Sequence, residues 1–211
     1  MQRQVPREPR WPAFLAMLTA AGVYFALPEP LSVGPRWLLL AIIVVLLIPI
    51  VILACRGNYG LTRILTFLAN GSITIAMIAS LVLLVRGIPL HLETPQALLR
   101  SAGILWVTNI LVFALWYWKL DAGGPLKREL PNGMAQSSFL FPQMTSGATN
   151  RDPCWVPNFT DYLFLAFNTS TAFSPTDTAV LSRWAKLGTM LQSLLSLTII
   201  ALLAARAVNI L

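Results

Sequence analysis

Charged residues are scarce in this chain of 211 residues. They make up 11% of the sequence, whereas hydrophobic residues make up 56%. A soluble domain normally carries about twice that charged fraction, so the composition excludes an ordinary soluble protein and indicates an all-α, multi-pass integral membrane protein. The net charge of +7 does not predict a nucleic-acid partner, because basic residues of membrane proteins mainly set orientation and contact lipid headgroups. The lipid bilayer is therefore the first partner that we expect.

Residues that perform catalysis or bind metals are also rare. The sequence has one histidine, two cysteines and eight scattered acidic residues. It contains no Ser/His/Asp set, H-E-x-x-H motif, P-loop or dinucleotide fingerprint, so we expect no enzyme activity, no catalytic residue, no metal site and no cofactor. Cys55 and Cys154 could pair, but two unpaired thiols are the simpler interpretation. His91, near Glu93, is more simply a solvated loop residue than a pH sensor.

Five apolar stretches approach the roughly 20 residues that a helix needs to cross a hydrocarbon core of about 30 Å. They are residues 11–27, 37–54, 66–85, 102–118 and 185–205. The first is short and could be tilted or interfacial. No small-x-small cleavage site follows it, so we interpret it as a retained helix rather than a signal peptide. The first three stretches lack basic residues at every third position, which excludes an arginine-helix voltage sensor.

A shorter apolar segment lies between the last two of these stretches. Residues 159–177 read FTDYLFLAFNTSTAFSPTD, a short amphipathic helix followed by a polar turn that contains proline. The order of span, long loop, half-helix, polar turn and span is that of a re-entrant pore loop. Non-helical backbone at membrane depth is tolerated only where it lines a cavity or is buried in protein. A pore loop meets this condition by assembling around a central axis, usually from four copies.

This segment resembles the pore domain of the tetrameric potassium-channel superfamily. Those channels typically read DALYFSFVTLTTVGYGD, and this chain reads DYLFLAFNTSTAFSPTD at the same length over residues 161–177. The positions that coincide are Asp161, Leu163, Phe167, Thr169, Thr171 and Asp177. The whole chain also resembles an uncharacterised bacterial membrane-protein family with the same FSPTD turn, a resemblance that implies no activity.

The potassium-channel resemblance covers roughly residues 101–211 and implies a homotetramer in the cell membrane. The first three apolar stretches predict a three-span N-terminal region over residues 1–100, and the resemblance implies a pore-like domain over 101–211. The expected parts of that domain are an outer helix at 102–118, a loop at 120–158, a pore helix at 160–170, a filter-like turn at 171–177 and an inner helix at 185–208.

The turn departs from the channel pattern at the residues that matter most. Ser174 and Thr176 stand at the two filter glycines, and Pro175 stands at the tyrosine. A potassium filter presents stacked rings of backbone carbonyls, which need residues that tolerate left-handed φ. Ser and Thr are disfavoured there, and proline fixes φ near −65°. We therefore predict that this turn does not form a potassium filter.

A tetramer of this turn would instead present hydroxyl and carboxylate groups. Rings of Thr171, Ser174 and Thr176 hydroxyls would pass partly hydrated monovalent cations with little discrimination, and four copies of Asp177 would favour cations electrostatically. Two alternatives are that Asp177 caps the turn and that Thr171 bonds a helix carbonyl. The predicted ion pathway consists of Thr171, Ala172, Phe173, Ser174, Pro175, Thr176 and Asp177.

Other positions in the domain are candidates for lining the pore or for contacts between helices or subunits. Gln192, Ser196 and Ile199 share one face of the last helix and are the natural lining of an inner pore, although packing against the outer helix explains them almost as well. Asn168 could contact a neighbouring subunit. Arg206 could extend to the membrane interface or surround an exit gate.

The expected function is passive, weakly selective cation conduction. The alternatives are a non-conducting scaffold or regulatory protein that retains the channel fold, and a pathway for anions or small solutes. Orientation stays open, because most of the fifteen basic residues fall on the side of the pore-loop entrance if all five stretches cross. The positive-inside rule makes that side cytoplasmic, whereas the resemblance makes it extracellular.

Overall fold

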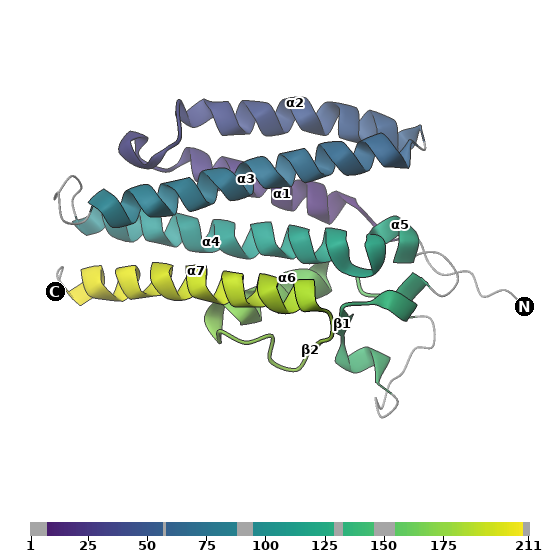
Figure 1. The fold of residues 1–211 in the computed structure, drawn as a ribbon. Helices are drawn as coiled ribbons and strands as arrows, with labels where there is room; N and C mark the ends of the chain where they lie inside the picture. The colour runs from purple at the N-terminus through teal and green to yellow at the C-terminus, as the bar shows by residue number, and fades with distance from the viewer. Residues whose placement is uncertain (1–7, 57, 88–94, 129–132, 146–154, 209–211) are drawn as a thin grey trace, which may run out of the picture. The chain divides into compact units, whose positions relative to one another are not determined.

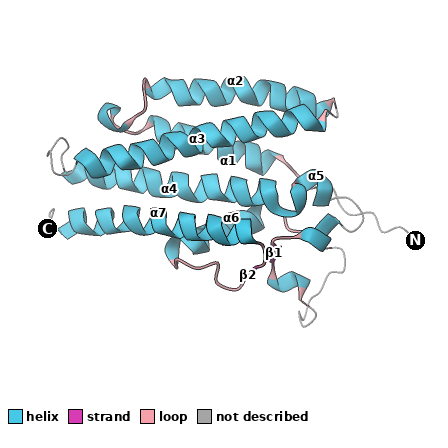
Figure 2. Cartoon of the chain, in the orientation of Figure 1, coloured by secondary structure: helices cyan, strands magenta, loops and turns pink. Residues whose placement is uncertain are grey.

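The structure is a computed structural model that describes residues 8–56, 58–87, 95–128, 133–145 and 155–208. It is mostly helical (Figure 2), and the strands in the described ranges, Phe139–Leu140 and Ala179–Val180, are two residues long. The predicted predominance of helix is therefore confirmed. His91, Glu93 and Cys154 lie outside the described residues, as do the side chains of Cys55 and Arg206.

Within the described ranges, four helices are long and apolar enough to cross a membrane, as expected of a multi-pass membrane protein. They are α2 (Arg36–Cys55), α3 (Tyr59–Gly87), α4 (Pro95–Leu120) and α7 (Arg183–Val208). The first predicted span corresponds to α1 (Trp11–Phe25), an apolar helix of 15 residues. At about 1.5 Å per residue, α1 is shorter than a typical hydrocarbon core, so its crossing stays a prediction.

The chain divides into two compact units. One comprises Met1–Ala13 with Phe113–Ser196 and is called the α6 unit here; the other comprises Phe14–Val112 with Leu197–Leu211 and is called the α3 unit. The boundary that we predict near residue 100 stays a prediction.

In the α3 unit, α2 and α3 lie side by side after a short turn (Figure 1). The face of α3 that contains Ala69, Ile73 and Met77 is buried, with the spacing of three and four residues that places side chains on one face of a helix. The Tyr24 hydroxyl in α1 lies 2.8 Å from the Ser80 hydroxyl in α3 and accepts a hydrogen bond from the Val33 N–H. It thereby joins α1, α3 and the segment around the 3₁₀ turn η1 (Glu29–Leu31).

The α6 unit contains several short elements around the half-helix α6. They are the 3₁₀ turn η2 (Asp121–Gly123), the helix α5 (Pro125–Arg128), the 3₁₀ turns η3 (Gly133–Gln136) and η4 (Pro142–Met144), the strands β1 (Phe139–Leu140) and β2 (Ala179–Val180), and α6 (Phe159–Thr171). The strands pair antiparallel, with Phe139 opposite Val180. Part of the loop expected at 120–158 is thus ordered as helical turns and a strand.

Aromatic side chains form the core of the α6 unit. The Phe139 ring makes edge-on contacts with the rings of Tyr117, Tyr162 and Trp184. Phe141 makes a similar contact with Tyr162, at 5.4 Å between ring centroids. Because Tyr117 belongs to α4, Tyr162 to α6 and Trp184 to α7, the strand residue Phe139 holds these three helices together.

Candidate functional site: the half-helix and its turn

The half-helix α6 begins with a capping box. The Asn158 side-chain oxygen accepts from the Thr160 N–H at 2.8 Å, and the Asp161 carboxylate accepts from the Asn158 N–H at 2.7 Å. These bonds satisfy backbone donors that a helix start leaves unpaired. Burial raises the pKa of Asp161 above its ordinary value, and its backbone hydrogen bonds oppose that rise. The local sequence therefore starts α6 where the resemblance places the pore helix.

The turn after α6 contains backbone in an unfavourable conformation. Phe173 and Thr176 both have φ of +54°, in the left-handed region that costs a non-glycine residue about 1 kcal/mol or more. Thr176 stands at one glycine position of the channel pattern. Ser174 stands at the other glycine position but does not have positive φ. The residue before it, Phe173, has positive φ instead. The order of left-handed residues in a potassium filter is therefore not reproduced.

The structure brings the predicted ion-pathway residues together in one surface turn. Pro175 is half-buried and the other six residues are exposed: Thr171, Ala172, Phe173, Ser174, Thr176 and Asp177. The turn thus carries hydroxyl groups, one carboxylate and one aromatic ring on the surface of a single chain.

Hydrogen bonds hold the turn against α6. The Asn168 amide donates to the Thr176 hydroxyl at 3.2 Å, and that hydroxyl donates to the Asp177 carboxylate at 2.6 Å. The Thr176 N–H also lies within hydrogen-bond distance of the Ser174 hydroxyl, at 3.3 Å. Asn168 therefore contacts the turn of its own chain.

The carboxyl group of Asp177 is exposed, and hydrogen bonds favour its ionised form. The hydrogen bond from the Thr176 hydroxyl, followed by one from its own backbone N–H, holds the pKa of Asp177 below its ordinary value of 3.8.

The Thr171 hydroxyl donates to the Phe167 carbonyl at 2.9 Å, which is the helix-carbonyl bond that the sequence leaves open as an alternative.

The polar residues of α7 bind the end of α6 within the chain. Gln192 accepts from the Tyr117 hydroxyl and donates to the Ala166 carbonyl, both at 2.7 Å. The Ser196 hydroxyl donates to the Ser170 carbonyl at 2.6 Å. The last carbonyls of a helix have no partner inside the helix, so Ser196 satisfies one of them.

These positions agree with the packing alternative for the inner-helix residues. Gln192, Ser196 and Ile199 are fully buried within a single chain, and lining of an inner pore by them stays a prediction. The exposed surface of α7 includes five large apolar side chains, Leu187, Met190, Leu191, Leu194 and Leu197, together with the polar residues Arg183, Lys186 and Thr198.

A buried ion pair near α6 is absent from our sequence-based predictions. The Arg128 guanidinium donates to the Glu8 carboxylate at 2.9 Å and to the Trp118 carbonyl at 2.7 Å. The Arg128 side chain is fully buried, that of Glu8 nearly so, and the guanidinium lies 5.0 Å from the centroid of the Tyr162 ring. The pair ties the segment before α1 to α5 and α6.

Asp121 forms a second buried polar centre in the same unit. Its carboxylate accepts from the Tyr162 hydroxyl at 2.6 Å, from the Ser137 hydroxyl at 2.9 Å and from the Ser138 N–H. No sequence motif joins these positions; the one available signal is that charged residues beside apolar spans are rare and need partners when buried.

A metal centre is not found in the described part of the chain, where no three or more His, Cys, Asp and Glu side chains gather. Comparison with protein-family models, curated proteins and solved structures gives no match for this chain. The class defined by the structure is a multi-pass membrane protein with four long apolar helices, a capped half-helix and a strained, exposed turn.

Proposed function

We propose that this chain is the subunit of a homotetrameric channel that passes monovalent cations, with weak selectivity, through a bacterial cell membrane. The narrowest part of the pore is the turn over residues 171–177, which enters the membrane from one side after α6. In this proposal α1 is a fifth, tilted crossing, so that five spans surround the re-entrant segment.

The observation that carries the proposal is the combination of strain, exposure and charge in this turn. Backbone strain at Phe173 and Thr176 persists only where surrounding structure enforces it, and such strain is concentrated at functional sites. The same turn exposes hydroxyls and the ionised carboxylate of Asp177. Four copies around an axis would form a cation-attracting mouth.

The altered backbone supports weak rather than potassium-type selectivity. A dehydrated potassium ion is bound by successive backbone carbonyls that point into the pore. Left-handed residues at the glycine positions produce this arrangement, but in this turn Phe173 is left-handed in place of Ser174. Hydroxyl groups at Ser174 and Thr176 would contact ions that keep part of their water. We therefore expect sodium and potassium to pass at similar rates.

Cation flux into liposomes that contain the purified full chain tests this proposal. Asp177→Asn should lower the flux of sodium and potassium roughly tenfold at low ionic strength, because a charged mouth concentrates counter-ions, and the difference should shrink in high salt. Glu29→Gln is the matched control, since Glu29 is an exposed carboxylate of the α3 unit. Flux that rejects sodium sharply, or anion flux insensitive to Asp177→Asn, would contradict the proposal.

One observation favours a second candidate, a non-conducting scaffold that retains the channel fold. The polar residues expected to line the inner pore are bonded inside the chain, and α7 exposes large apolar side chains from Leu187 to Leu197. A pore lined by leucine and methionine excludes water and conducts no ions. An intact tetramer without measurable flux, in wild type and in Leu194→Ser alike, would support this candidate.

A further inference from the structure

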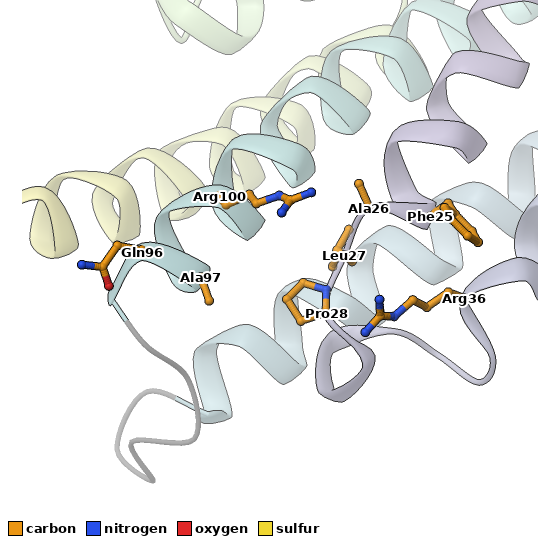
Figure 3. Close-up of a pocket in the computed structure, with 8 residues that line it drawn as sticks. All are labelled: Phe25, Ala26, Leu27, Pro28, Arg36, Gln96, Ala97 and Arg100. Carbon is orange, nitrogen blue, oxygen red and sulfur yellow. The ribbon is translucent and has the colours of Figure 1, made fainter.

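A cavity in the α3 unit combines two arginines with apolar walls. It has a volume of about 620 Å³ and is lined by Phe25, Ala26, Leu27, Pro28, Arg36, Gln96, Ala97 and Arg100 (Figure 3). The guanidinium groups of Arg36 and Arg100 are directed toward the stretch 26–28 that lies between them in this view (Figure 3). The stretch 26–28, which follows α1, therefore lies between two cations that line one cavity.

The positive charge of this cavity is incompletely neutralised. Glu29 lies 3.6 Å from Arg36, but its side chain is 79% exposed, so the pair is screened by solvent and weak. Among the described residues no carboxylate lies within ion-pair distance of Arg100. The cavity also receives the first turns of α2 and α4, which contain no acidic residue. Because the N-terminus of a helix carries partial positive charge, an anion would be favoured here by both arginines and both helices.

The walls indicate that this anion carries a hydrocarbon portion. Phe25, Pro28 and Ala97 supply apolar surface beside the guanidinium groups. A second cavity of about 490 Å³ adjoins the first, shares Phe25 and Arg36 with it, and is also lined by Trp37. Trp37 is 60% exposed at the start of a spanning helix, where tryptophan contacts lipid headgroups.

From these observations we propose that the cavity binds an anionic membrane phospholipid. One of the two guanidinium groups donates two parallel hydrogen bonds to phosphate oxygens, the other attracts the anion from across the stretch 26–28, and an acyl chain lies against the exposed ring of Phe25. Basic pockets between spanning helices are known binding sites for such headgroups. This site is independent of the turn at 171–177 and of whether the protein conducts ions.

Native mass spectrometry of the full chain in neutral detergent tests the proposal by titration with phosphatidylglycerol. Phosphatidylglycerol should bind at concentrations at which phosphatidylcholine does not. Arg36→Gln and Arg100→Gln should each weaken binding about fivefold, the contribution of one basic residue near an anionic surface, and Arg36→Lys should weaken it less. Arg86→Gln is the matched control, because Arg86 lies in the last turn of α3 and does not line either cavity. It should leave binding unchanged.

Three results would overturn the proposal. The first is equal binding of phosphatidylglycerol and phosphatidylcholine. The second is an equal loss in Arg86→Gln and Arg100→Gln, which would indicate unspecific surface charge. The third is complete displacement of phosphatidylglycerol by an equal concentration of inorganic phosphate, which would assign the cavity to a free anion. The unfolding temperature of each lipid-free variant is measured first, and the lysine variants replace any glutamine variant that does not fold.

Discussion

Two buried amide side chains occupy different environments in the apolar helices. Gln192 has hydrogen-bond partners for both its oxygen and its nitrogen, in Tyr117 and Ala166. Asn70 in α3 is 3% exposed, and neither its oxygen nor its nitrogen has a hydrogen-bond partner among the described residues. A side-chain amide should therefore contribute differently to the free energy of unfolding at Gln192 and at Asn70.

Substitution of each amide by leucine should reveal this difference. Gln192→Leu should lower the free energy of unfolding by about 1–3 kcal/mol, because the Tyr117 hydroxyl loses its acceptor. Asn70→Leu should be neutral or stabilising, because it removes a buried polar group without breaking a bond within the described structure. Unfolding in detergent measures both, and destabilisation of similar size in the two variants would contradict this prediction.

The ion pair between Glu8 and Arg128 should be strongly stabilising only as long as both partners are present. Glu8→Gln leaves the guanidinium of Arg128 buried without its counter-charge, and loss of one partner of a buried pair costs about 3–5 kcal/mol. Arg36→Gln, which breaks the exposed pair with Glu29, should change the stability by less than about 1 kcal/mol. The two variants are compared by thermal unfolding in the same detergent, and equal shifts would contradict the burial argument.

The charge of Asp177 should persist in mildly acidic solution. Because hydrogen bonds hold the pKa of Asp177 below 3.8, the carboxylate is ionised above that pH and gains its proton only as the pH falls through the lowered value. We therefore expect cation flux to be constant between about pH 8 and pH 5. A loss of flux between pH 7 and pH 5 that is absent in Asp177→Asn would contradict this expectation and indicate that carboxylates of different subunits repel one another.

At the scale of the element, the turn after α6 is strained at specific positions. Glycine adopts left-handed backbone without penalty, whereas alanine does not. At Phe173 and at Thr176, which have positive φ, the glycine variant should be about 1 kcal/mol more stable than the alanine variant. Ser174, which is not among the residues with positive φ, is the control, and there alanine should be at least as stable as glycine. Thermal unfolding of the six variants gives the three differences, and a uniform preference for alanine would refute the backbone description.

At the scale of the whole molecule, the four spanning helices predict which segments share a side of the membrane. If α2, α3 and α4, which follow one another, each cross once, Arg56 and Gln143 should lie on one side and Gln96 on the other. Single cysteines at these positions, after replacement of Cys55 and Cys154 by serine, can be labelled with a thiol reagent that does not cross membranes. Labelling of Arg56→Cys and Gln143→Cys from opposite sides would show that one of α3 and α4 does not cross.

The predictions that the sequence supports best depend on local pattern. Runs of apolar residues predict spanning helices because the length and hydropathy of a segment are properties of neighbouring residues. The start of α6 was equally accessible, because Asn158 and Asp161 form a capping box within four residues. The identity of the spanning helices and the position of the half-helix needed no knowledge of distant contacts.

The hydrogen-bond partners of polar side chains could not be predicted from the local sequence pattern. The residues of the last helix that fit a pore lining, Gln192 and Ser196, bond α4 and α6 in the same chain, and periodicity alone cannot distinguish a lining face from a packed face. The pairing of Glu8 with Arg128 joins residues separated by 120 positions. Spacing does not indicate such a pair.

The sequence by itself determined that this is a helical membrane protein, where its spanning helices lie and that its turn at 171–177 lacks the glycines of a potassium filter, because these follow from composition and local order. Only the tertiary structure decided which polar groups are bonded inside the chain, which residues of the turn take left-handed backbone, and that Arg36 and Arg100 share a cavity. Those features depend on how distant segments pack, because packing sets burial and hydrogen-bond geometry. The local sequence does not predict such contacts.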